Sequence, residues 1–140
     1  MKVTMLLADS AQIQNGKLYI LGGGWTGIKP GNRSFAVVWL VSVPWNATNE
    51  KHSFELKLLD TDGKPFVVPS DKGPQEVKVG GEFEAGRPPG TAKGSSTLIP
   101  MSVNITSLPL PPQKRLYWKL FINGESKDEW ELPFSTNDPE

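Results

Sequence analysis

Cysteine is absent from this chain of 140 residues, and histidine occurs once. The lack of cysteine excludes disulfide bonds, thiolate nucleophiles and zinc or iron–sulfur sites that need cysteine ligands. A catalytic relay of the Ser-His-Asp or Cys-His kind could use only His52, because no second imidazole can replace it. We interpret His52 as an exposed residue at the start of a strand. No catalytic, cofactor-binding or metal-binding residue is predicted.

An excess of charge of either sign is also missing, since 15 Lys and Arg balance 15 Asp and Glu. No global field therefore attracts nucleic acid or an anionic membrane. The N-terminal apolar run is interrupted at Thr4 and ends at Asp9, so it is too short for a signal-peptide core or a membrane span. We expect cytoplasmic synthesis, and the length favours one domain, over residues 1–136, with a short tail at 137–140.

What the chain does contain is 13 Pro, 14 Gly and many short apolar segments with period-two patterning. The clearest segments are two alternating runs near the C-terminus: Leu116, Trp118, Leu120 and Ile122, then Trp130, Leu132 and Phe134. They flank Asn123-Gly124, and this combination predicts two antiparallel strands joined by a tight turn. The Pro-rich residues 108–112 just before them cannot form a helix or a central strand, so we predict a stiff segment leading into the hairpin.

Similar reasoning predicts the other strands, at 2–7, 18–21, 35–43, 54–58, 66–68, 77–83 and around 101–105. Residues 35–43 are apolar on both faces, which marks a central strand or one whose outer face is covered by a loop or partner. No stretch has a sustained helical period, and turns recur at regular intervals. The sequence therefore predicts an all-β fold, a single antiparallel β-sandwich of immunoglobulin-like type with about eight strands.

Several connecting segments also carry specific expectations. Residues 9–15 are expected to form a loop or a single helical turn that ends at Asn15-Gly16. The three glycines at 22–24 indicate a bulge or a very close neighbour. Gly80-Gly81 predicts a second bulge, which would shift the phase so that Phe83 faces inward.

Motifs that carry chemistry are weak in this chain. Asp60-Thr61-Asp62-Gly63 resembles the start of a calcium loop, but Lys64 and Asp71 occupy later ligand positions, so a plain hairpin turn is favoured. In the basic-aromatic run 114–119, Trp118 and Lys119 point to opposite faces of a strand, which favours a core tryptophan and a solvated lysine. Carboxylate pairs for glycoside hydrolysis could come from Glu82, Glu84, Glu125, Asp128, Glu129 and Glu131. Their spacing fixes no mutual distance, and the acids after residue 124 also suit protection of a sheet edge.

Five tryptophans in a chain of this length leave room for one or two exposed rings. Trp45 follows a proline at a strand end and Trp25 adjoins the triple glycine, so these two are expected to be the most accessible. An exposed tryptophan can stack on a sugar or anchor a protein partner. Together with Arg87, Pro88 and Pro89 of the irregular loop 86–94, they are the candidate partner-binding residues.

Seven segments carry a resemblance to known sequences: ADSAQ (8–12), GKLYILGGGW (16–25), VPW (43–45), LLDTDG (58–63), GRPPG (86–90), LPLPP (108–112) and INGE (122–125). On these segments, which extend over nearly the whole chain, the protein resembles a family of small uncharacterised all-β proteins of bacteria, actinobacteria in particular, and their phages. Relatives often carry an aromatic residue in place of Leu116 and an Asp in place of Asn123, and neither departure disturbs the hairpin. The resemblance implies a sandwich and no activity.

By elimination, the sequence favours a non-catalytic interaction or structural module that acts through protein contact. A phage or prophage virion protein, such as a capsid-decoration or auxiliary protein, is the leading hypothesis, with itself or a capsid or tail protein as partner. No cofactor, nucleic acid or membrane is expected. The alternative is a carbohydrate-binding module that uses an exposed tryptophan, and a carboxylate-dependent hydrolase is the least favoured function.

Overall fold

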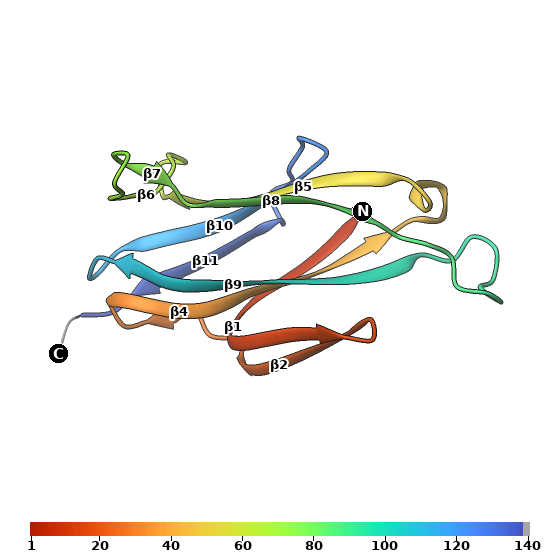
Figure 1. Ribbon diagram of the computed structural model, residues 1–140, viewed down its shortest axis with the longest axis horizontal. Coiled ribbons are helices and arrows are strands. Elements are labelled where there is room, and N and C mark those ends of the chain that lie inside the picture. Colours follow the sequence, from red (N-terminus) through yellow and green to blue (C-terminus); the bar gives the residue numbers. More distant parts are fainter. Residues whose placement is uncertain (139–140) are drawn as a thin grey trace.

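The computed structural model describes residues 1–138, which form an all-β structure built mainly of antiparallel strands (Figure 1). One sheet has the order β2 (Lys17–Gly23), β1 (Lys2–Gln14), β4 (Gly31–Val43) and β9 (Thr97–Leu110). The other has the order β3 (Gly27–Ile28), β11 (Glu131–Thr136), β10 (Arg115–Ile122), β5 (Lys51–Asp60) and β8 (Lys78–Glu84). A small ribbon of β6 (Val67–Val68) and β7 (Gln75–Glu76) and the 3-10 turn η1 (Trp45–Ala47) complete the described elements. Only β3, which runs parallel to β11, departs from antiparallel pairing among the strands of residues 1–138.

The two sheets share one hydrophobic core. Its largest contributions come from alternate residues of two facing strands, Phe35, Val37, Trp39, Val41 and Val43 of β4 and Leu116, Trp118, Leu120 and Ile122 of β10. Each of these side chains is at most 5% exposed. Met101, Val103 and Ile105 of β9 pack against the same cluster. The alternation predicted for residues 116–122 is confirmed, because period-two geometry points every second side chain of a strand toward the opposite sheet.

The hairpin of β1 and β2 packs on the outer face of β4. Ala36 and Val38 of β4 form a second buried cluster with Ala8 and Ala11 of β1, and Leu6 and Leu18 pack against it. β1 is the neighbour of β4 in the sheet and also contacts β9. Its second half bends away from the sheet (Figure 1). This hairpin explains why residues 35–43 are apolar on both faces.

Residues 9–15 are not the predicted loop or helical turn. Residues 9–14 continue β1, and Asn15-Gly16 is a two-residue turn into β2 with φ angles of 51° and 72°. Positive φ at both positions is the type I′ geometry that Asn-Gly favours. The polar character of this stretch, which suggested a loop, arises because most of its side chains face solvent on a hairpin outside the core.

The C-terminal hairpin is confirmed, with β10 paired to β11. Asn123 and Gly124 have φ angles of 53° and 81°, and Ile122 and Glu125 exchange backbone hydrogen bonds across this turn. Residues 126–129 then leave the ribbon before the backbone of Leu120 donates to the carbonyl of Trp130. The tight turn is therefore as predicted, followed by an extra loop.

Two smaller expectations need correction. The Gly80-Gly81 bulge is wrong: β8 pairs with β5 in one unbroken register, because Phe83 already shares the parity of Val79 and needs no phase shift. Gly81 instead leaves space for Phe54, whose ring would lie 2.9 Å from an added Cβ. Leu108 and Leu110 are buried in an edge strand, so the Pro-rich segment is partly strand.

The expected free tail at 137–140 is wrong in its first residue. The backbone N–H of Asn137 donates to Ile28, and its carbonyl accepts from Gln113. Residues 139–140 lie outside the described residues. Within residues 1–138, no helix has the length and apolar character required to span a bilayer.

Candidate functional site

Trp45 and Arg87, two of the predicted partner-binding residues, are brought together at the end of β4. The guanidinium carbon of Arg87 lies 3.6 Å from the centroid of the Trp45 ring. Arg87 Nε donates to Thr48 Oγ1 at 2.6 Å, and Nη2 donates to the carbonyl of Trp45 at 2.7 Å. Arg87 therefore covers one face of the ring through a cation–π contact and is held there by two hydrogen bonds.

The other candidates lie apart from this pair or project freely. Trp25 is half-buried, and its ring packs edge-on to Phe35 at a centroid distance of 5.6 Å, near the opposite end of β4. Pro88 and Pro89 are exposed in the loop that follows Arg87. The structure thus joins Trp45 with Arg87, whereas Trp25 belongs to the margin of the core.

His52 is buried, so the expectation of an exposed strand position is wrong. It is 5% exposed and its ring lies 5.3 Å from that of Phe83. Nε2 donates to the carbonyl of Ala47 at 2.8 Å, and Nδ1 accepts from Asn123 Nδ2 at 3.0 Å. Both ring nitrogens are used in tying the C-terminal turn to η1, which is a structural role.

The acidic residues considered for hydrolysis do not form a site. Glu131 bonds Lys119 at 2.8 Å on the surface of the β10–β11 ribbon. It lines one shallow surface depression, which contains no other of these six acids. Among residues 1–138, no group of three or more His, Asp or Glu side chains could hold a metal ion.

Asp60, the first residue of the motif that resembles a calcium loop, caps its own turn. Its side chain accepts hydrogen bonds from the backbone N–H groups of Asp62 and Lys64.

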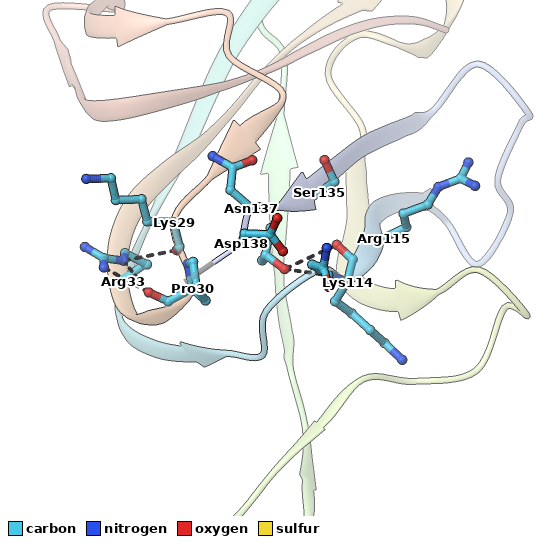
Figure 2. A pocket seen from close by; sticks show the side chains of 10 residues that line it. Lys29, Pro30, Arg33, Lys114, Arg115, Ser135, Asn137 and Asp138 are labelled. Atoms are coloured by element: carbon cyan, nitrogen blue, oxygen red, sulfur yellow. Dashed lines mark hydrogen bonds between the residues drawn. The ribbon is translucent and has the colours of Figure 1, made fainter. Parts of the chain in front are cut away.

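An open hollow with a basic rim lies where β4 and β10 begin and β11 ends (Figure 2). Lys29 and Arg33 stand on one side of Asn137 and Asp138, and Lys114 and Arg115 stand on the other. Within residues 1–138, these four cations form no ion pair. Arg33 is held by three hydrogen bonds to the carbonyls of Lys29 and Pro30. Because the cations flank the hollow in two groups and do not converge, the rim offers diffuse attraction for anions and no single anion cradle.

The β1–β2 hairpin presents an apolar surface that the sequence reasoning missed. Tyr19 is 51% exposed and Leu21 is 71% exposed, on the face of the hairpin that points away from β4. They lie opposite Gln12 and Ser10 of β1, so that face mixes large apolar and uncharged polar side chains. Residues 18–21 are apolar on both faces, and this pattern is the signal from which an exposed apolar face could have been predicted. The sequence predicts no such surface, because residues 9–15, most of which form the partner strand, are expected there to be a loop or a helical turn.

Gly22 and Gly23 lie at the base of this hairpin, where there is no room for a side chain. A Cβ on Gly22 would lie 2.1 Å from Asp9 Oδ2, and one on Gly23 would lie 2.9 Å from the Ile20 side chain. The register from Ser10–Leu21 to Ala8–Gly23 is unshifted, so the glycines serve close approach, one of the two predicted alternatives.

Residues 3–135 match a family of unknown function, DUF6941, and the chain belongs to that family. No curated protein matches the sequence.

Proposed function

We propose that this family member is a non-catalytic interaction module whose docking element is the β1–β2 hairpin. The observation that carries the proposal is the exposure of Tyr19 and Leu21 on a strand that ends its sheet. Large exposed apolar side chains gathered on one element are typical of protein-binding surfaces. The setting suggested by the sequence, a virion or another large assembly, is a place where such a module would act.

The protection of the other sheet edges supports the same proposal. Soluble β-proteins usually block free edges with proline, charge or very short strands. β9 carries Pro100 and Pro109, β8 carries Lys78, Glu82 and Glu84, and β3 has two residues. β2 contains no proline, and its sole charge is Lys17 at the beginning.

We also propose that the frame is an immunoglobulin-like sandwich. The order β1-β4-β9 facing β11-β10-β5-β8 corresponds to strands A-B-E and G-F-C-C′ of that class. On this assignment, β2 is an addition at the outer side of the first strand. An apolar element added to a widely shared fold can supply the binding function of one particular protein.

Glycan binding has less support. A sugar stacks on an open aromatic face, and Arg87 covers one face of Trp45 while Trp25 packs against Phe35.

The test compares two double variants in extracts of the cells or virions that carry the protein. In the hairpin variant, Tyr19→Asp is combined with Leu21→Asp. In the control, Val67→Asp is combined with Leu98→Asp, at two other large apolar residues that are 50% and 59% exposed. Circular dichroism and thermal unfolding check that both variants fold.

We expect the wild-type and control chains to sediment in an assembly larger than the monomer and the hairpin variant to sediment as the monomer. A hairpin variant that stays in the assembly would show that docking uses another surface. A wild-type chain that is monomeric in every extract would overturn the proposed function itself.

A further inference from the structure

We propose that β2 pairs antiparallel with β2 of a second copy of this chain, across a two-fold axis at Tyr19. The proposal rests on the proposed function and names the partner of the same hairpin. It requires three features of β2: free backbone groups on its outer edge, a self-complementary sequence and no like charges that would meet.

The free backbone groups follow from the turn geometry. Asn15-Gly16 is a two-residue turn, so Gln14 and Lys17 form a hydrogen-bonded pair, and hydrogen-bonded pairs alternate along the ladder. The backbone N–H and C=O groups of Tyr19 and Leu21 therefore form hydrogen bonds with β1. Leu18 and Ile20 direct their N–H and C=O groups away from it, and β2 has no neighbour on that side in the described sheet. These are the groups that a strand added at the edge would bond.

A two-fold axis at Tyr19 places Leu18 opposite Ile20 of the second copy. The outward groups of these two residues then form four hydrogen bonds, two on each side of the axis. Residues 17–21 are the regular part of the strand, because Gly22 has a φ of 63°. An axis at Tyr19 pairs all of this regular part with itself.

The side chains are compatible with this register. Tyr19 lies opposite Tyr19 of the second copy, and aromatic pairs at such positions stabilise antiparallel sheets. Lys17 lies opposite Leu21 of the second copy, so the sole charge in residues 17–21 does not face a like charge. On the other face, Leu18 and Ile20 meet as two apolar side chains. The contact is isologous, and it closes as a dimer in which the two β1–β2 hairpins form one four-stranded antiparallel ribbon.

The small area of a single strand–strand contact limits the affinity that we expect for the dimer. Five paired residues per copy bury less than a standard interface, so we expect a dissociation constant on the order of micromolar. The dimer should therefore appear in sedimentation of the purified chain at tens of micromolar and dissociate on dilution.

The absence of cysteine allows a register-specific test. In the variant Tyr19→Cys, two identical thiols lie directly opposite in a pair that is not hydrogen-bonded, with Cα atoms about 4.5 Å apart, within the range of a disulfide. In the control Leu21→Cys, the thiol is more exposed, but its counterpart lies four residues further along the strand, about 13 Å away. We expect oxidation of the purified variants to give disulfide-linked dimer at least about tenfold faster for Tyr19→Cys.

Faster linkage of Leu21→Cys would overturn the proposal, because it would show random collision of exposed thiols. Faster linkage of an Ile20→Cys variant would overturn the axis at Tyr19. A purified chain that stays monomeric, with neither variant linked, would overturn self-pairing. The proposed function would survive that result if the hairpin double variant still left the native assembly.

Discussion

β2 and β9 are the two edge strands of the same four-stranded sheet, and they differ in the features that block the addition of a further strand. β9 carries Pro100 and Pro109, and each removes an N–H donor that an edge strand directs to solvent. Its pairing with β4 also changes register between Arg33 and Phe35. β2 has no proline, and its exposed Tyr19 and Leu21 stand beside open backbone groups. An edge without blocking features beside one with several indicates a contact surface at β2.

The first prediction compares the outer face of β4, which the hairpin covers, with the outer face of β9, which is exposed. We expect it to have the largest effect. Ala36 is fully buried under the hairpin, whereas Asn104, directly opposite on β9, is exposed. Ala36→Asp places an unpaired charge in the buried cluster and should lower the free energy of unfolding by about 3–5 kcal/mol. Asn104→Asp should change it by less than about 0.5 kcal/mol. Urea unfolding measures both, and a small loss at Ala36 would mean that the hairpin does not cover β4.

The second prediction concerns the base of the hairpin. Gly22→Ala adds a Cβ at a φ of 63° and against Asp9, so it should cost about 2 kcal/mol or more of unfolding free energy. Gly16→Ala, at a φ of 72° with no atom within 4 Å of the added Cβ, should cost about 1 kcal/mol. Thermal unfolding of the two variants compares the costs. Equal losses would show that the Asp9 side chain moves aside freely and that only backbone strain counts.

Local patterning explains why much of the fold could be predicted from the sequence. Alternation in 116–122 identified the inward face of that strand, the two apolar faces of 35–43 identified a central strand, and Asn123-Gly124 identified the tight turn, because each signal depends on neighbouring residues. The same Asn-Gly signal at 15–16 marked a turn. The strand before it was missed because its side chains face solvent on a hairpin that leaves the core.

Contacts between distant segments explain what the sequence could not show. His52 shares the parity of Leu56 and Leu58, so its inward direction could have been predicted, but its bonds to Ala47 and Asn123 depend on loops brought together by the fold. The stacking of Arg87 on Trp45 likewise joins residues 42 positions apart. Tyr19 and Leu21 became a candidate surface only when the structure placed β2 at an edge.

The third prediction transfers the blocking feature of β9 to β2. Ile20→Pro removes the outward N–H of β2 in each copy and should weaken the dimer at least about tenfold, or 1.4 kcal/mol. The control is Tyr19→Pro, which removes an N–H that bonds β1, and it should lower the stability of the monomer as well. Sedimentation across a dilution series measures dissociation, and urea unfolding measures stability. An unchanged dimer in Ile20→Pro would mean that β2 does not pair through its outer edge.

The smallest effect is expected when β9 is unblocked. Pro100→Ala restores one donor to an edge that still has Pro109 and the register shift beside Arg33, so the chain should gain no association at this edge at tens of micromolar. Its unfolding free energy should change by less than about 1 kcal/mol, because the restored N–H faces water. Light scattering of Pro100→Ala in the Ile20→Pro background isolates β9 from β2. Strong association there would mean that a single proline protects β9, and that the contrast between the edges depends on one residue.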